Sequence, residues 1–174
     1  AEVDPDYSDI VSIELDRLGD VDTGDPNTLS DFVTWGVNTF PSDKLAVILW
    51  NHGWSWSLQS TTSSTKGIMS DDSTGNDVSV AQGEFEEILQ SAVEQRGNKI
   101  DILGLDACIM QSWEVAVVSE PYAEFLVASQ DYVNWDGWAY DQFLRELVDT
   151  TNMSSIDLAE SINRTFWRSG DSTI

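Results

Sequence analysis

One histidine and one cysteine stand out because each follows a short apolar run. His52 comes after residues 45–50, Leu-Ala-Val-Ile-Leu-Trp, and Cys108 comes after residues 100–105, Ile-Asp-Ile-Leu-Gly-Leu. The chain contains no other histidine and no other cysteine. A thiol beside an imidazole can act as the nucleophile in acyl transfer, with the imidazole accepting or returning the proton. The two residues are therefore candidates for a catalytic pair.

Taken singly, neither residue indicates catalysis. A lone cysteine after a strand is more often a small buried hydrophobic residue than a nucleophile. A lone histidine in a turn is also more often structural. His52 and Cys108 share one position, each at the end of an apolar run. For the pair, this gives the catalytic and the structural interpretations equal weight.

The apolar runs are the elements that must position this pair. They do not alternate with polar residues, which is typical of strands covered on both faces in a parallel sheet, and residues 125–130 form a third such run. Ligands of open α/β sheets bind beyond the carboxyl ends of the strands, so His52 and Cys108 are expected to meet at one edge. There the backbone N–H groups of Gly53 and Cys108 could stabilise a developing oxyanion, since glycine allows close approach of a substrate.

Helical spacing of apolar residues separates these runs. It predicts helices over residues 28–40, 79–96, 109–118, 140–149 and 155–168. A weaker alternating pattern over residues 10–18 predicts an additional strand. The alternation of strand and helix indicates one domain with a doubly wound or three-layer α/β sandwich architecture.

Three of the predicted helices start at recognisable residues. Thr28 with Asp31, and Ser79 with Gln82, resemble capping boxes. A helix beginning at Ile109 would place Cys108 at its N-terminus, where the helix dipole would favour a thiolate.

The charge of the chain limits its partners. It carries 31 Asp and Glu against 8 Lys and Arg, a formal net charge of -23 over 174 residues. This field repels phosphate backbones and anionic lipid, so no nucleic-acid binding is expected, while basic peptides would be attracted. No apolar run has the length that membrane insertion requires. The low lysine content fits either a high-salt habitat or a secreted acidic protein.

The acidic turn around Asp20, Asp22 and Asp25 raises the question of calcium. Its order of acids and glycines does not match the twelve-residue calcium loop, so a solvated turn is the favoured interpretation.

The two reactive blocks also carry a family resemblance. Residues 45–53 and 100–110 resemble the two signature blocks of the clostripain-like cysteine peptidases, relatives of caspases, legumains and gingipains. Shorter supporting blocks follow in the family's order, at residues 24–29, 114–116, 127–130 and 136–140. The resemblance implies a caspase-like three-layer α/β sandwich with a mostly parallel central sheet flanked by helices. It also implies that residues 1–174 form a single peptidase domain of a longer protein, with flanking elements at both ends.

In this family the chemistry is cysteine-type endopeptidase activity through a thioester, which implies His52 and Cys108 as the dyad. The acid two residues before the nucleophile lines the pocket for the side chain preceding the scissile bond, here Asp106, and would select peptide or protein substrates with Arg or Lys. Asp131 and Asp136 are weaker candidates for the same pocket, against the alternative of a solvated loop. For Asp106 the alternative is a carboxylate that caps the following helix.

Relatives are commonly matured by cleavage between the two blocks, which implies processing of the bond between Lys66 and Gly67 in an exposed Ser/Thr-rich loop. The chemistry requires no cofactor; some relatives depend on calcium, and no residue set identifies such a site here. The resemblance also implies a secreted or cell-surface prokaryotic protein.

The alternative function is a catalytically inactive module of the same fold that binds basic peptides or protein partners. A nucleotide-binding domain is a poor interpretation because no Gly-rich phosphate loop follows a strand.

Overall fold

The computed structural model describes residues 14–56 and 67–170, and within them three strands form one parallel sheet. The strands are β1 (Ala46–Trp50), β2 (Ile100–Asp106) and β3 (Ala123–Ala128), paired in the order β1-β2-β3. The predicted parallel sheet is therefore confirmed. The strand predicted over residues 10–18 is not: residues 14–18 belong to no strand, and residues 10–13 lie outside the described part of the chain.

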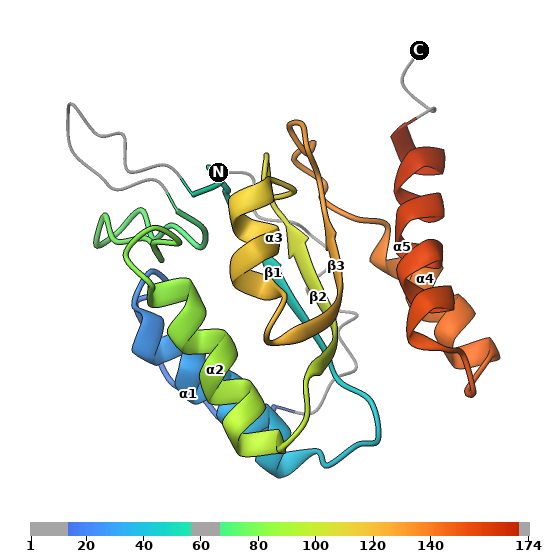
Figure 1. Ribbon diagram of the computed structural model, residues 1–174, viewed down its shortest axis with the longest axis horizontal. Helices are drawn as coiled ribbons and strands as arrows, with labels where there is room; N and C mark the ends of the chain where they lie inside the picture. The colour runs from blue at the N-terminus through green and yellow to red at the C-terminus, as the bar shows by residue number, and fades with distance from the viewer. Residues whose placement is uncertain (1–13, 57–66, 171–174) are drawn as a thin grey trace.

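Helices cover both faces of the sheet, as Figure 1 shows. Those in the described residues are α1 (Pro26–Thr39), α2 (Glu84–Arg96), α3 (Trp113–Ser119), α4 (Tyr140–Asp149) and α5 (Ser155–Gly170). Helices α1, α2 and α3 lie on one side of the sheet, and α4 and α5 lie on the other. This is the predicted three-layer α/β sandwich.

Strand β1 shows why the runs lack polar alternation. Val47 and Leu49 are buried against the cluster that includes residues of α1 and α2. Ile48, which points to the opposite face, packs with Trp138 and the α4–α5 layer. Because successive side chains of a strand point to opposite faces and both faces are covered, all three positions require apolar residues.

Two helices begin away from the predicted capping boxes. Helix α1 is capped by Asp25, whose carboxylate accepts a hydrogen bond from the Asn27 N–H at 2.9 Å, and Pro26 occupies the first helical position. Ser79 does accept from the Gln82 N–H at 3.1 Å, but helix α2 begins only at Glu84, after a turn at residues 80–83. The local contact was predictable, whereas the residue at which the helix starts was not.

The prediction that Cys108 starts a helix is wrong. Helix α3 begins at Trp113, with Ser112 as its N-cap. The intervening turn pairs with the segment that follows β3, since the Ile109 N–H donates to the Asp131 carbonyl at 3.1 Å and the Gln111 N–H donates to the Ser129 carbonyl at 2.8 Å. Long-range backbone pairing thus replaces the first predicted helical turn.

Candidate active site

The register of the sheet brings the two reactive turns together. Trp50, the last residue of β1, is the pairing partner of Asp106, the last residue of β2. His52 and Cys108 each lie two residues beyond this pair, at the carboxyl edge of the sheet. The turns touch at Gly53, where a β-carbon would lie 2.6 Å from the carbonyl oxygen of Cys108. Only glycine allows this approach of the two backbones.

A cavity of about 110 Å³ opens at this edge. Its lining comprises Trp50, Asn51, His52, Asp106, Ala107, Cys108, Val133 and Trp135. The structure thus brings three of the predicted site residues to one cavity, with two exposed tryptophans at its margin. The ring of Trp135, which is 85% exposed, lies 5.6 Å from the imidazole of His52 between centroids.

The sulfur of Cys108 is partly buried and is held by one backbone segment. The Val133 N–H donates to Sγ at 3.3 Å, and the thiol lies 3.7 Å from the Val133 carbonyl oxygen that it can donate to. Val133 belongs to the segment between β3 and α4. The position of the thiol therefore depends on a third turn at the same edge of the sheet.

His52 is exposed, and its turn is fixed through Asn51. The Asn51 Oδ1 accepts from the His52 N–H at 2.5 Å, and the Asn51 Nδ2 donates to the Ser70 carbonyl at 3.1 Å. The backbone of the turn is thus anchored while the imidazole faces the cavity opening. This arrangement leaves the imidazole able to exchange protons with a bound ligand.

Asp106 is the buried charge of the site, with 1% of its surface exposed. Its Oδ2 accepts from the Trp138 N–H at 2.8 Å and from the Tyr140 O–H at 3.0 Å. Its Oδ1 has no hydrogen-bond partner in the described structure. Burial raises the pKa of Asp106, and the two hydrogen bonds oppose that rise without cancelling it. Asp106 does not cap α3, since Ser112 does, so the capping interpretation was wrong.

The other predicted residues lie elsewhere. Asp131 and Asp136 are exposed and outside the lining of this cavity; the Asp131 carboxylate accepts from the adjacent Tyr132 N–H at 2.7 Å, as a turn carboxylate does. Lys66 lies outside the described residues. Gly67 is described, and it is buried rather than in an exposed loop.

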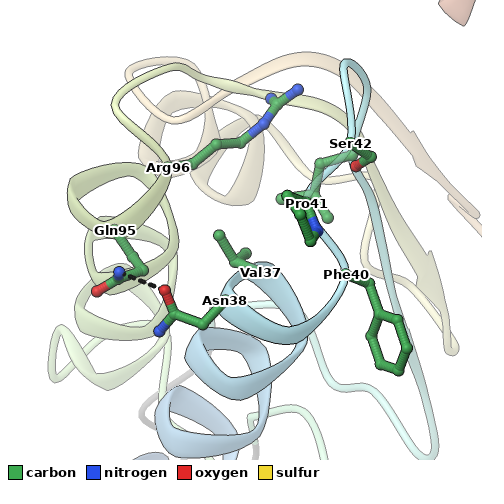
Figure 2. Close-up of a pocket in the computed structure, with 8 residues that line it drawn as sticks. Val37, Asn38, Phe40, Pro41, Ser42, Gln95 and Arg96 are labelled. Atoms are coloured by element: carbon green, nitrogen blue, oxygen red, sulfur yellow. Dashed lines mark hydrogen bonds between the residues drawn. The ribbon is translucent and has the colours of Figure 1, made fainter.

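Three further cavities lack Cys108 in their lining, although His52 also lines one of them, of about 260 Å³, together with Asp71, Asp72 and Asp77. The cavity in Figure 2 has a volume of about 290 Å³ and lies between the end of α1 and the start of β1. It is therefore at the amino edge of the sheet. Across it the Gln95 side chain donates to Asn38 at 2.6 Å, drawn as a dashed line. Within residues 14–56 and 67–170, no group of three or more His, Cys, Asp or Glu residues could hold a metal ion.

The roles of four aromatic residues in the site were not predicted. Trp50 and Trp135 line the cavity, and Trp138 and Tyr140 hold Asp106. Trp50 ends the first apolar run, whereas Trp135, Trp138 and Tyr140 belong to the aromatic-rich residues 132–140, which lie far from either reactive block along the chain. Val133 gave no signal because it acts through its backbone.

Comparison with known proteins places the chain in a family. The sequence profile of the Clostripain family matches residues 2–174. The chain belongs to the Clostripain family. Clostripain of Hathewaya histolytica is 30% identical over 128 residues, which cover 68% of this chain and 23% of that protein. The chain therefore spans about a quarter of the length of this curated relative.

Solved structures of similar fold are also family proteases. A secreted cysteine protease of Bacteroides thetaiotaomicron, bound to an irreversible peptide inhibitor, has a TM-score of 0.66 and 24% identity, with 82% of this chain and 37% of that chain covered. An inactive zymogen from Parabacteroides distasonis has a TM-score of 0.58 and 17% identity over 86% of this chain and 37% of that one. The predicted caspase-like α/β fold of the Clostripain family is thus confirmed.

None of the helices in the described residues is long and apolar enough to span a bilayer.

Proposed function

We propose that this member of the Clostripain family is a cysteine endopeptidase that cleaves after Arg or Lys. The observation that carries the proposal is the cavity shared by Cys108, His52 and Asp106. It combines a nucleophile, a proton carrier and a buried carboxylate with one oxygen that lacks a partner in the described structure. A basic side chain of a substrate would supply that partner and offset the cost of the buried charge.

The reaction would proceed through a thioester. The Cys108 thiol loses its proton to His52, and its sulfur attacks the carbonyl carbon of the scissile bond. The backbone N–H groups of Gly53 and Cys108 would donate to the resulting oxyanion. The C–N bond then breaks as His52 protonates the leaving amine. Water, deprotonated by His52, attacks the thioester and releases the acid and the thiol, so the cycle uses no cofactor.

The tryptophans at the cavity margin would assist binding. Trp50 is 60% exposed and Trp135 is 85% exposed, and an aromatic face can stack on a guanidinium or ammonium group. The net charge of -23 would also draw basic peptides toward the chain. By analogy with the secreted relative, we propose a secreted or cell-surface location.

Hydrolysis of reporter peptides ending in Arg, Lys or uncharged Gln tests the function. We expect turnover of the Arg and Lys peptides and none above background for Gln, with loss of turnover in Cys108→Ala and in His52→Ala. Asp106→Asn should lower turnover of basic peptides at least 100-fold. Asp136→Asn, which removes an exposed carboxylate from outside the cavity, is the matched control. Binding of basic peptides without turnover would instead indicate the inactive binding module.

We further propose that the protein processes itself between Lys66 and Gly67, after a basic residue that suits its own specificity. Ile68 pairs with Gly53, which itself contacts the carbonyl of Cys108, so the segment that begins at Gly67 lies beside the reactive turns. Intact mass of the purified protein tests this: two fragments are expected for the wild type and one chain for Cys108→Ala. A single chain in both would contradict self-processing.

A further inference from the structure

The segment that begins at Gly67 braces the turn that carries His52. The Trp54 N–H donates to the Gly67 carbonyl at 2.9 Å, and Ile68 forms an antiparallel bridge with Gly53. Ile68 is fully buried. The contact from Asn51 to the Ser70 carbonyl adds a further link to the same turn. Any event that displaced residues 67–70 would therefore disturb the position of the imidazole.

The nitrogen of Gly67 points at a carboxylate. Its N–H donates to the Asp77 Oδ2 at 3.0 Å. Asp77 is held in place by its neighbour Val78, which exchanges two backbone hydrogen bonds with Ile68, each of 2.9 Å. One short ladder thus places the backbones of Asp77 and Gly67 side by side, within reach of the hydrogen bond from the Gly67 nitrogen to the carboxylate.

The residue at this position has no room for a side chain. Gly67 is buried, and a β-carbon there would lie 1.7 Å from the carbonyl oxygen of Val78. A newly formed amino group at Gly67 could occupy the same place because neither glycine nor the two added hydrogens demand the space of a β-carbon.

We propose that Asp77 receives the α-amino group of Gly67 when the bond after Lys66 is cut, and that this ion pair keeps the His52 turn braced in the cut protein. The inference rests on the self-processing proposed above. Hydrolysis breaks the C–N bond, adds the hydroxyl of water to the Lys66 carbonyl carbon, and leaves the nitrogen with its hydrogens. At neutral pH the amine takes up a proton, so the donor to the Asp77 carboxylate changes from a neutral amide N–H to an ammonium group, and an ion pair replaces the hydrogen bond of the uncut chain.

The ion pair is needed because cleavage requires local opening. A bond whose nitrogen is buried and hydrogen-bonded cannot bind a protease in place, so residues 67–68 must leave the ladder to be cut and then return. The ammonium–carboxylate pair adds the attraction of opposite charges to the hydrogen bond that the amide made, which favours the return of the new terminus. Cleavage then leaves the turn of His52 as firmly held as before.

The test makes the cut with an external enzyme. In the full chain carrying Cys108→Ala, residues 61–66 are replaced by the recognition sequence of a site-specific protease that cleaves before glycine. After cutting, the Gly67 amine is acetylated with a trace of acetic anhydride at pH 8, and the rate is measured by mass spectrometry. Acetylation is expected to be at least tenfold slower than in the same protein with Asp77→Asn. Asp72→Asn, which removes an exposed neighbouring carboxylate, is expected to acetylate as slowly as the parent.

A second variant covers the case in which Asp77→Asn fails to fold. One additional glycine placed directly before Gly67 moves the amine one residue outward and leaves Asp77 intact, so rapid acetylation is expected. Equal acetylation rates in the parent and in this variant would overturn the proposal. The external protease makes the cut in a chain that lacks the thiol, so the acetylation result does not depend on self-processing. A failure of self-processing would appear only in the intact mass of the purified wild-type protein.

Discussion

The backbone of Gly53 lies directly against the carbonyl oxygen of Cys108, so that a β-carbon at Gly53 would be 2.6 Å from that oxygen. This contact joins the turn after β1 to the turn after β2. The sheet register brings the two strand ends level at Trp50 and Asp106, and the absence of a side chain at Gly53 lets the turns close on each other. The relation between the lone imidazole and the lone thiol depends on both features.

Substitution of this glycine should loosen that contact. In Gly53→Ala the new methyl would meet the backbone of Cys108 and also the β-carbon of Ala107 at 2.8 Å, so the backbone must shift. We expect a loss of about 1–3 kcal/mol in the free energy of unfolding, typical of overpacking, with reduced peptide turnover. Urea unfolding measures the first quantity and reporter peptides the second.

Gly36→Ala is the matched control. Gly36 lies within helix α1, and a β-carbon there would have nothing within 4 Å. Replacing a helical glycine by alanine should stabilise the protein by about 0.5–1 kcal/mol. Equal effects of the two substitutions would show that the close approach at Gly53 is absent.

Asp106→Asn should stabilise the protein while it removes activity on basic peptides. Burial raises the pKa of Asp106 in the folded state, so the ionised carboxylate favours the unfolded state at neutral pH. Removing the charge should raise the free energy of unfolding at pH 7 by on the order of 1 kcal/mol. The gain should shrink as the pH falls through the raised pKa toward the ordinary value of 3.8, below which both states are protonated. Thermal unfolding from pH 7 to pH 4 measures it.

Asp101→Asn is expected to act with the opposite sign. Burial acts to raise the pKa of Asp101, but the Leu45 N–H at 2.9 Å and the Arg96 guanidinium at 2.8 Å outweigh it, and the pKa is lowered. Its ionised form therefore stabilises the fold above the ordinary pKa, and this stabilisation is lost as the pH falls through the lowered value. If both Asn variants shifted stability in the same direction at pH 7, the assignment of the two carboxylates would be wrong.

Trp135→Ala should affect substrate binding and leave stability unchanged. The ring is 85% exposed, so little buried area is lost, but it faces the imidazole across the cavity margin. Loss of cation–π stacking worth about 0.5–1 kcal/mol predicts a roughly 2- to 5-fold higher KM for peptides ending in Arg. Trp113→Ala, which removes a ring on α3 that is 79% exposed, should leave KM unchanged. The same rise in KM in both variants would argue against a role for Trp135 in the cavity.

The strands and the edge at which the reactive residues meet could be predicted because the relevant signals are local. An unbroken apolar run predicts a strand covered on both faces, and parallel strands place their carboxyl ends at one edge. Helices α4 and α5 were predicted for the same reason, since their apolar positions recur with helical spacing. These predictions required no knowledge of distant contacts.

The remaining features depend on pairs of residues far apart in the sequence. The segment after Cys108 is a turn and not a helix because the Ile109 and Gln111 N–H groups bond to residues 131 and 129, and no local sequence signal near Ile109 indicates this. Likewise, Asp106 is held by Trp138 and Tyr140, more than thirty residues later. Asp131 was a weaker candidate for the same pocket, and it is exposed to solvent. The family resemblance pointed to both carboxylates, and only the packing separated them.

The most direct measurement is covalent labelling of the purified protein with an arginyl acyloxymethyl ketone, followed by mass-spectrometric location of the adduct. The thiolate of Cys108 should displace the acyloxy group and give a single adduct on that residue, with labelling slowed at least 100-fold in His52→Ala and unchanged in Asp136→Asn. A protein that stays unlabelled, or that is labelled at Cys108 at the same rate without His52, would contradict a thiol and an imidazole acting together at this edge of the sheet.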